Sequence, residues 1–422
     1  MVDKPLLESE IFWKILDVTR QLSSPVELDE MLVEVVDVAR SVLEADRGTV
    51  FLFDEQTDEL YAEVGTGLDM QEIRFSVDKG IAGLCARTGR IINVSDVYSH
   101  DHFNPDIDKQ SGYLTGCLLN IPLIGLNNTL VGVMQLVNKI GGHFGKNDER
   151  IAEVLASQCA VALQRARLLR EYIVKQKLEH DLILARIIQR SLLPEEMPNI
   201  PGYDLAGWNE PADQTGGDIF DALSLDGSRV LLLLADVCGH GIGSALSVTQ
   251  FRAMIRISLR LQCDLHDLHE HANNQLVEDL AGDHFITSFI GILNTEDHRI
   301  NYHACGQGPL LHFHSDTGEV DQLPASTIPI GIMPSIPLKE PDPIEMAPGD
   351  IFALISDGVF EQPDSSNRQF GVESVIRVIL ENRDQPMIEL VNYLREGVLN
   401  HAGKQSQDDD MTIVLVKRMA DV

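Results

Sequence analysis

The residues with the clearest chemical potential are aspartates in the C-terminal half of the chain, each close to an apolar run or a glycine. They lie in four segments: GGDIFD (216–221), LADVCGHG (234–241), SDGVFE (356–361) and DDDMT (408–412). Apolar runs of this kind form core strands, so we expect these carboxylates at the rim of a core. Ionised groups there are costly unless they are paired, and few Lys or Arg residues lie near them in the sequence.

A divalent cation would balance this charge. Oxygen ligands without Cys or clustered His favour Mg²⁺ or Mn²⁺ over zinc. Two such ions that share a bridging Asp lie ~3.5–4 Å apart and can hold a hydroxide for in-line attack on phosphorus. The glycine-rich turn after Asp236 would also let the carbonyl of Val237 approach a metal. Each cluster alone has an ordinary explanation as a turn, an exposed loop or a helix cap, but four within one domain favour a metal site.

In this order and with these separations, the four segments resemble the metal-dependent protein phosphatases of the PPM superfamily. The resemblance is greatest to the bacterial branch typified by the sporulation stage II E phosphatase, and SLLPEEMPNIPGYDLAG (191–207) resembles the lead-in of that branch. It implies that Asp236 bridges two metals, and the three consecutive aspartates leave open which of 408–410 is the terminal ligand. The implied catalytic residues are Asp218, Asp236, Asp357 and Asp409, and the implied metal ligands are these four with Val237 and Asp410.

The reaction that this resemblance implies is hydrolysis of phosphoserine or phosphothreonine in a protein by a metal-bound water, with two Mn²⁺ or Mg²⁺ ions as cofactors. The expected substrate is a phosphorylated protein of the anti-sigma-factor antagonist type. Two other classes stay open. A catalytically silent phosphatase-like scaffold or ligand-binding regulator could hold metal structurally, and the GGD of GGDIFD prompts a nucleotide cyclase, although a cyclase does not require the three later acidic segments.

The elements that must position these aspartates are interleaved strands and helices. Apolar runs at 229–237, 285–293, 350–356 and 411–416 indicate strands, and helical periodicity occurs at 242–262, 264–281 and 371–399. Strands with amphipathic helices between them fit a sandwich with helices outside the sheets. The expected fold class is α+β, with an N-terminal sensory domain, a long connecting helix and a C-terminal α-β-β-α PPM sandwich.

A long helix is expected before the acidic domain, because residues 147–193 contain no proline and no interior glycine. Such a helix would run on the order of 70 Å, a length typical of a coiled coil that joins two domains and dimerises. Two ordinary helices with a frayed joint are the alternative. The expected domains are therefore 1–146, a sensory domain; 147–193, a coiled-coil-like linker helix; and 194–422, the phosphatase domain.

The first domain resembles GAF domains in two segments, KGIAGLCARTGRIINVSDVYSHDHFNPDID (79–108) and TGCLLNIPLIGLNNTLVGVMQLVNK (115–139). NKIGGHFGKNDE (138–149) also retains the NKFDE pattern of cyclic-nucleotide GAF domains, in which the Lys and Asp form a salt bridge that braces the pocket. The resemblance implies a sensor of cAMP or cGMP, with Asp96, Thr115 and Gly116 as candidate binding residues. A ligand-free module that only dimerises is the alternative.

Composition limits the partners. The net charge of −32 disfavours binding to a phosphate backbone, so we expect no nucleic acid partner. No apolar stretch is long enough to cross a membrane and no signal-peptide pattern occurs at the N-terminus, so we expect a cytoplasmic protein without a membrane partner. The expected assembly is a homodimer through the GAF domain and the linker helix.

Overall fold

The computed structural model describes residues 28–62, 73–105, 108–109, 112–239, 241–280, 284–338 and 340–420. The chain divides into two compact units, Met1–Lys177 and Leu178–Val422. Both are mixed α and β, in agreement with the expected fold class. No helix in these described ranges is long and apolar enough to span a membrane.

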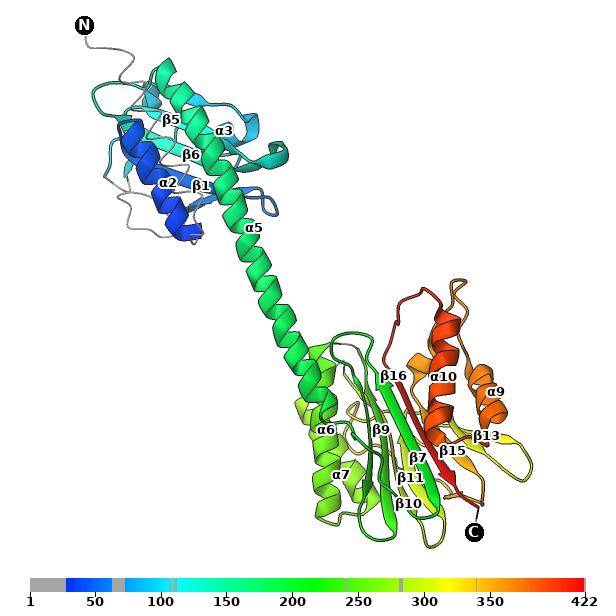
Figure 1. Cartoon of the computed structure of the whole chain (residues 1–422). Helices are drawn as coiled ribbons and strands as arrows, with labels where there is room; N and C mark the ends of the chain where they lie inside the picture. Colours follow the sequence, from blue (N-terminus) through cyan, green and yellow to red (C-terminus); the bar gives the residue numbers. More distant parts are fainter. Residues whose placement is uncertain are drawn as a thin grey trace. The chain divides into compact units, whose positions relative to one another are not determined.

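The first unit contains one antiparallel sheet in the strand order β3-β2-β1-β6-β5-β4 (Figure 1). Its central pair is long, since β1 and β6 pair from Ala45 opposite Lys139 to Leu52 opposite Gly132. The elements are α2 (Leu28–Val42), β1 (Ala45–Asp54), β2 (Glu59–Ala62), β3 (Ile73–Ser76), α3 (Gly80–Thr88), β4 (Ile92–Val94), η1 (Val97–Ser99), β5 (Leu118–Ile124), η2 (Leu126–Asn128) and β6 (Leu130–Lys139).

Alternation along the strands divides the apolar residues of this sheet between two cores. Val50 and Leu52 of β1 pack with α2 and with the first part of α5 (Lys146–Arg190). Phe51, between them in the sequence, packs with Ala82 and Cys85 of α3 on the other face. Because successive strand residues point to opposite faces, one strand supplies both layers of the unit.

The helix α5 runs without a break over 45 residues, which confirms the long connecting helix and excludes a frayed joint. From Ala152 to Ala166, small and apolar residues are buried in the first unit. Beyond them most side chains are exposed as far as the last turns, where Gln189 is half-buried. The helix ends at Arg190, and Pro194 lies shortly beyond it, as is common at helix C-termini.

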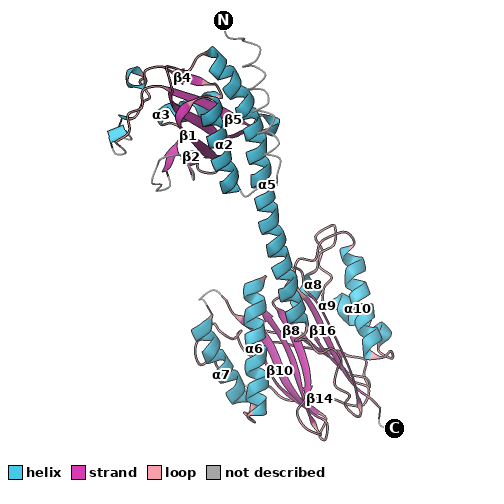
Figure 2. Ribbon diagram, turned by 60° about the vertical axis from the view of Figure 1, so that its left-hand side comes forward, coloured by secondary structure: helices cyan, strands magenta, loops and turns pink. Residues whose placement is uncertain are grey.

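The second unit is a sandwich of two five-stranded antiparallel sheets, in the orders β14-β11-β10-β9-β8 and β13-β12-β15-β16-β7 (Figure 2). The strands are β7 (Tyr203–Glu210), β8 (Asp218–Ser224), β9 (Arg229–Val237), β10 (Ile286–Asn294), β11 (Arg299–Cys305), β12 (Leu310–Phe313), β13 (Val320–Leu323), β14 (Ile344–Glu345), β15 (Ile351–Ile355) and β16 (Met411–Arg418).

Helices cover the outer face of each sheet, which confirms the α-β-β-α arrangement (Figures 1 and 2). One core lies between the sheets and includes Phe289 and Phe352. A second core packs α6 (Ile242–Arg260) and α7 (Leu265–Asp279) on the β9 sheet. A third packs α8 (Asp357–Glu361), α9 (Val372–Asn382) and α10 (Met387–Ala402) on the β16 sheet.

Candidate metal and phosphate site

The predicted site residues of the second unit gather where the two sheets meet at one end of the sandwich. Asp218, the first residue of β8, lies directly opposite Asp236 near the end of β9. Asp357 follows β15 as the first residue of α8, and Asp409 and Asp410 precede β16. Each sheet therefore supplies carboxylates to the same place.

The electrostatics of Asp236 reflect the other carboxylates in this part of the unit. Burial and the negative charges of Asp357, Asp409 and Asp410 raise its pKa to about 7. The surrounding protein and the charge of Asp409 also raise the pKa of Asp357. Neighbouring like charges disfavour ionisation, and a divalent cation would relieve the repulsion. The donor set, oxygen atoms alone, fits Mg²⁺ or Mn²⁺.

Asp218 is a buried member of the group. Burial, followed by the charges of Asp236 and Asp410, raises its pKa well above the ordinary value. Its Oδ2 accepts a hydrogen bond from Thr412 Oγ1 at 2.6 Å, and Thr412 Oγ1 in turn accepts one from Asn209 Nδ2 at 2.8 Å. A chain of polar groups from β7 and β16 thus fixes one oxygen of a β8 carboxylate.

Asp410 differs from Asp409 in what its carboxylate contacts. Oδ1 of Asp410 accepts the amide of Ala212 at 2.7 Å, and Oδ2 accepts the amides of Gly217 and Asp218. Its carboxylate is buried and ties the loop before β8 to the start of β16. Asp409 is exposed, and its Oδ1 accepts a local hydrogen bond from the amide of Asp410, the next residue. Asp409 therefore has the freer carboxylate.

Two glycines are required by this close packing. A Cβ at Gly216 would lie 2.4 Å from Asp410 Oδ2, and one at Gly217 would lie 2.7 Å from the carbonyl oxygen of Val237. Both distances are shorter than any side-chain contact allows, so only glycine fits. The carbonyl of Val237 consequently faces the loop that carries Asp218.

The last turn of α5 holds the same loop. The side-chain amide of Gln189 donates to the carbonyl of Gly216 at 2.6 Å and accepts from the amide of Gly216 at 3.1 Å. Both main-chain groups of Gly216 are thereby bound by one side chain. The distance along the chain from Gly216 to Asp218 is two residues, so the helix end is coupled to the start of β8.

Other polar residues in the four acidic segments have structural partners. Asp221 is fully buried and pairs with Arg252 and Arg256 of α6, at 3.0 and 2.6 Å. Cys238 exchanges hydrogen bonds with Phe285, accepting the Phe285 amide at its Sγ and donating its own amide to the Phe285 carbonyl. His240 lies outside the described residues.

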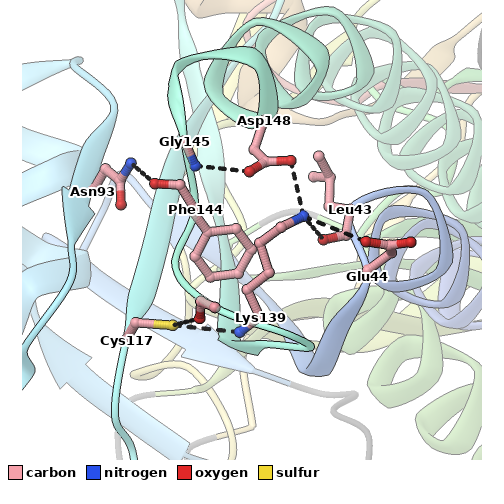
Figure 3. Close-up of polar contacts among 9 residues, drawn as sticks. Leu43, Glu44, Asn93, Cys117, Lys139, Phe144, Gly145 and Asp148 are labelled. Atoms are coloured by element: carbon pink, nitrogen blue, oxygen red, sulfur yellow. Dashed lines mark hydrogen bonds and ion pairs between the residues drawn. The ribbon is translucent and has the colours of Figure 1, made fainter. Parts of the chain in front are cut away.

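In the first unit, the motif at 138–149 forms the expected salt bridge (Figure 3). Lys139 Nζ lies 3.0 Å from Asp148 Oδ1 and donates to the carbonyl of Leu43 at 3.2 Å. The other oxygen of Asp148 accepts the amide of Gly145 at 2.7 Å, so the carboxylate also fixes the start of α5. Phe144 is buried beneath the lysine. The Lys139–Asp148 salt bridge and the bond to Leu43 thus join β6 to α5 and to the turn after α2.

The three candidate nucleotide-binding residues lie near one another, since the amide of Val97, next to Asp96, donates to the carbonyl of Gly116. Their polar groups bind protein neighbours here. Asp96 caps η1 by accepting the amide of Tyr98, the amide and hydroxyl of Thr115 both donate to Asp108, and the amide of Gly116 donates to Asn138. Their role toward a ligand stays a prediction.

Several residues around the carboxylates were not expected from the sequence. Thr412 lies within the DDDMT segment, so its nearness could have been inferred from that motif. Ser356 begins the SDGVFE segment, so its nearness could have been inferred in the same way. Asn209 and Gln189 carry no such signal, because their contacts with the site depend on the pairing of distant elements. Ser356 Oγ accepts the amide of Thr412 and donates to the carbonyl of Asp410, which links β15 to β16.

Comparison with protein families agrees with this division of the chain. The model of the GAF domain matches residues 27–163, and the model described as stage II sporulation protein E (SpoIIE) matches residues 226–419. Among solved structures, the SiaA-PP2C domain of Pseudomonas aeruginosa superposes with a TM-score of 0.51 at 20% identity, over 58% of this chain and 98% of that one. At this identity the likeness establishes the fold of the second unit.

Curated relatives match parts of the chain. A probable 3',5'-cyclic phosphodiesterase of Caenorhabditis elegans is 36% identical over 167 residues, which cover 36% of this chain and 23% of that protein. Protein IcfG of Synechocystis is 23% identical over 265 residues, 56% of this chain and 41% of that protein. The cGMP-specific 3',5'-cyclic phosphodiesterase of Drosophila melanogaster is 28% identical over 205 residues, 45% of this chain and 18% of that protein. The chain therefore spans less than half the length of each.

Proposed function

Because this chain combines a GAF domain with a phosphatase domain of the SpoIIE family, we propose that it is a signal-regulated protein serine/threonine phosphatase that depends on two Mg²⁺ or Mn²⁺ ions. The observation that carries the proposal is the group of carboxylates from both sheets that raises the pKa of Asp236 to about 7. Two divalent ions bound there would supply an activated water and offset negative charge on the phosphoryl oxygens.

Each residue of the group has a distinct proposed role. Asp236, which has neighbours from both sheets, would hold both ions, and the carbonyl of Val237 would add an oxygen ligand. Asp357 and Asp409 complete the shell of one ion, while Asp218 supplies a further carboxylate. We assign Asp410 to positioning, because both of its oxygens accept main-chain amides that fix the loop before β8.

The substrate proposed is a phosphoserine or phosphothreonine protein of the anti-sigma-factor antagonist type. The support for this class is the resemblance of the four acidic segments to the bacterial sporulation and stress-response branch of the PPM superfamily. The end of α5, through Gln189 and Gly216, provides a route by which a signal could alter the placement of Asp218.

The proposed signal is a cyclic nucleotide, cAMP or cGMP, bound by the GAF domain. Support comes from the salt bridge between Lys139 and Asp148, which follows the pattern of cyclic-nucleotide GAF domains (Figure 3). Two relatives are cyclic nucleotide phosphodiesterases by name. Nucleotide binding to the GAF domain would then change the conformation of α5, whose residues belong to both units.

The test is hydrolysis of a phosphate ester and of a phosphoserine protein by the full chain with Mn²⁺, with and without each nucleotide. Asp357→Asn should lower kcat/KM by more than about 100-fold, since it removes a proposed ligand of the ions. The matched control is Asp364→Asn, an aspartate on the same unit that pairs with Arg368. Full Mn²⁺-dependent activity in Asp357→Asn would refute the metal assignment, and absence of turnover with every substrate would favour a silent scaffold.

A further inference from the structure

A second group of metal-ligating side chains lies at the other end of the β16 sheet. It contains His312 and, just after β12, His314, together with Asp321 of β13. β15 begins beside this group, at Ile351, and ends at Ile355, two residues before Asp357. Five strand residues span on the order of 17 Å, so the group is separate from the carboxylate site.

Strand geometry brings the three side chains together. His312 and His314 are two residues apart and therefore point to the same face of the sheet. His312 pairs directly with Asp321 across the β12–β13 ladder. Their neighbours Leu311 and Phe313 pack into the core beneath α9 and α10, so the histidines point away from those helices.

The distances suit a single small ion. His314 Nε2 lies 2.9 Å from Asp321 Oδ2, and the two imidazole ring centres are 4.2 Å apart. One ligand atom from each of the three residues lies within 4.8 Å of the others. Ligands held at ~2.0–2.1 Å around a tetrahedral ion are ~3.4 Å apart, so side-chain shifts of at most about 1.4 Å would complete the geometry.

A buried nitrogen atom of His312 has no hydrogen-bond partner among the described residues, which favours a bound ion nearby. His312 is only 5% exposed, and its Nε2 makes no hydrogen bond within the described part of the chain. The nearest carboxylate oxygen to it, Asp350 Oδ2, is 3.4 Å away and already accepts the amide of Ala347. Buried polar atoms are rarely left without a partner.

We propose that His312, His314 and Asp321 bind a transition-metal ion, with Zn²⁺ as the best match, at a site distinct from the carboxylate cluster. Two imidazoles and one carboxylate favour zinc over Mg²⁺ or Mn²⁺, and solvent completes the tetrahedron. Such an ion would fasten the edge strand β13 to β12, because Asp321 comes from one and His312 from the other. Its role is structural.

The test is a Zn²⁺ titration of the full chain by calorimetry, with Co²⁺ absorption as a second probe of tetrahedral geometry. An Asp357→Asn background weakens binding at the carboxylate cluster and isolates the histidine site. His314→Asn should remove one equivalent of Zn²⁺ or weaken its binding more than about tenfold, and should abolish the tetrahedral Co²⁺ spectrum. Zn²⁺ should also raise the Tm of the parent chain but not that of the variant.

Two further variants keep the test decisive. Asp321→Asn, on an exposed edge strand, should weaken Zn²⁺ without unfolding the protein, whereas substitution of buried His312 alone could act through folding. His271→Ala changes an exposed histidine of α7 and serves as the control. Equal Zn²⁺ stoichiometry and affinity in the parent, His314→Asn and Asp321→Asn chains would overturn the proposal and leave His314–Asp321 as an ordinary ion pair.

Discussion

At the scale of single residues, Asp236 couples protonation to stability. Its carboxyl has a pKa of about 7 in the folded, metal-free chain, against 3.8 as the ordinary value. The folded state therefore holds more protons than the unfolded state between these pH values. The free energy of unfolding should fall as pH rises from about 4 to about 7, by about 2 kcal/mol at most for a partly exposed group.

The measurement is urea denaturation in EDTA at several pH values in that window. Asp236→Asn should flatten the dependence, because an amide does not titrate. Adding Mn²⁺ should stabilise the parent chain more at high pH than at low pH, since the ligands must be deprotonated to bind it. A pH profile identical in parent and variant would contradict the assigned titration.

Residue types and spacing were enough to select the aspartates that the structure brings to one end of the sandwich, because each adjoins an apolar strand or a glycine turn. Their role as metal ligands stays a prediction. Residue types and spacing were not enough to distinguish the role of the Asp409 carboxylate from that of the Asp410 carboxylate. That distinction depends on which carboxylate accepts the amides of Ala212 and Gly217, nearly 200 residues away in the chain. Contacts of such separation leave no local pattern in a single sequence.

At the scale of elements, the end of α5 positions the loop before β8. Gln189→Ala removes both hydrogen bonds to Gly216 while raising helix propensity, so any loss of activity cannot come from a weaker helix. We expect kcat/KM to fall roughly 10-fold, with weaker Mn²⁺ activation, as for other outer partners of metal ligands.

The matched control is Gln275→Ala, which should leave the rate unchanged, because Gln275 is an exposed residue of α7 whose side chain donates a local hydrogen bond to Asp279. Equal metal activation curves for Gln189→Ala and the parent would show that the bonds to Gly216 do not position Asp218.

The elements themselves were more predictable than their contacts. Periodicity and the lack of proline or interior glycine predicted the long helix, which the structure has as one element from Lys146 to Arg190. The pattern did not show that its early residues pack in the GAF core, because burial of Ala152 and Ala166 depends on the sheet beneath them. Small residues on a charged helix indicate close packing only when the sheet or helix that packs against them is known.

At the scale of the whole molecule, the exposed apolar residues of α5 bear on assembly. Val154, Val161 and Leu168 are 47%, 42% and 57% exposed at intervals of seven residues, which is the repeat of a coiled-coil seam. We propose that a second copy of the chain covers them. Leu168→Glu should then convert a dimer to a monomer in light scattering, because it places a charge in the seam.

Leu168→Met, which keeps the apolar surface, should remain dimeric. Since Leu168 is exposed in the single chain, Leu168→Glu should leave the folding of each domain intact, and circular dichroism should match that of the parent. If the dimer transmits the GAF signal, the monomeric variant should lose any response to cAMP or cGMP and keep its Mn²⁺-dependent basal turnover. A parent chain that is monomeric at micromolar concentration, or a Leu168→Glu variant that stays dimeric, would place the interface elsewhere or exclude it.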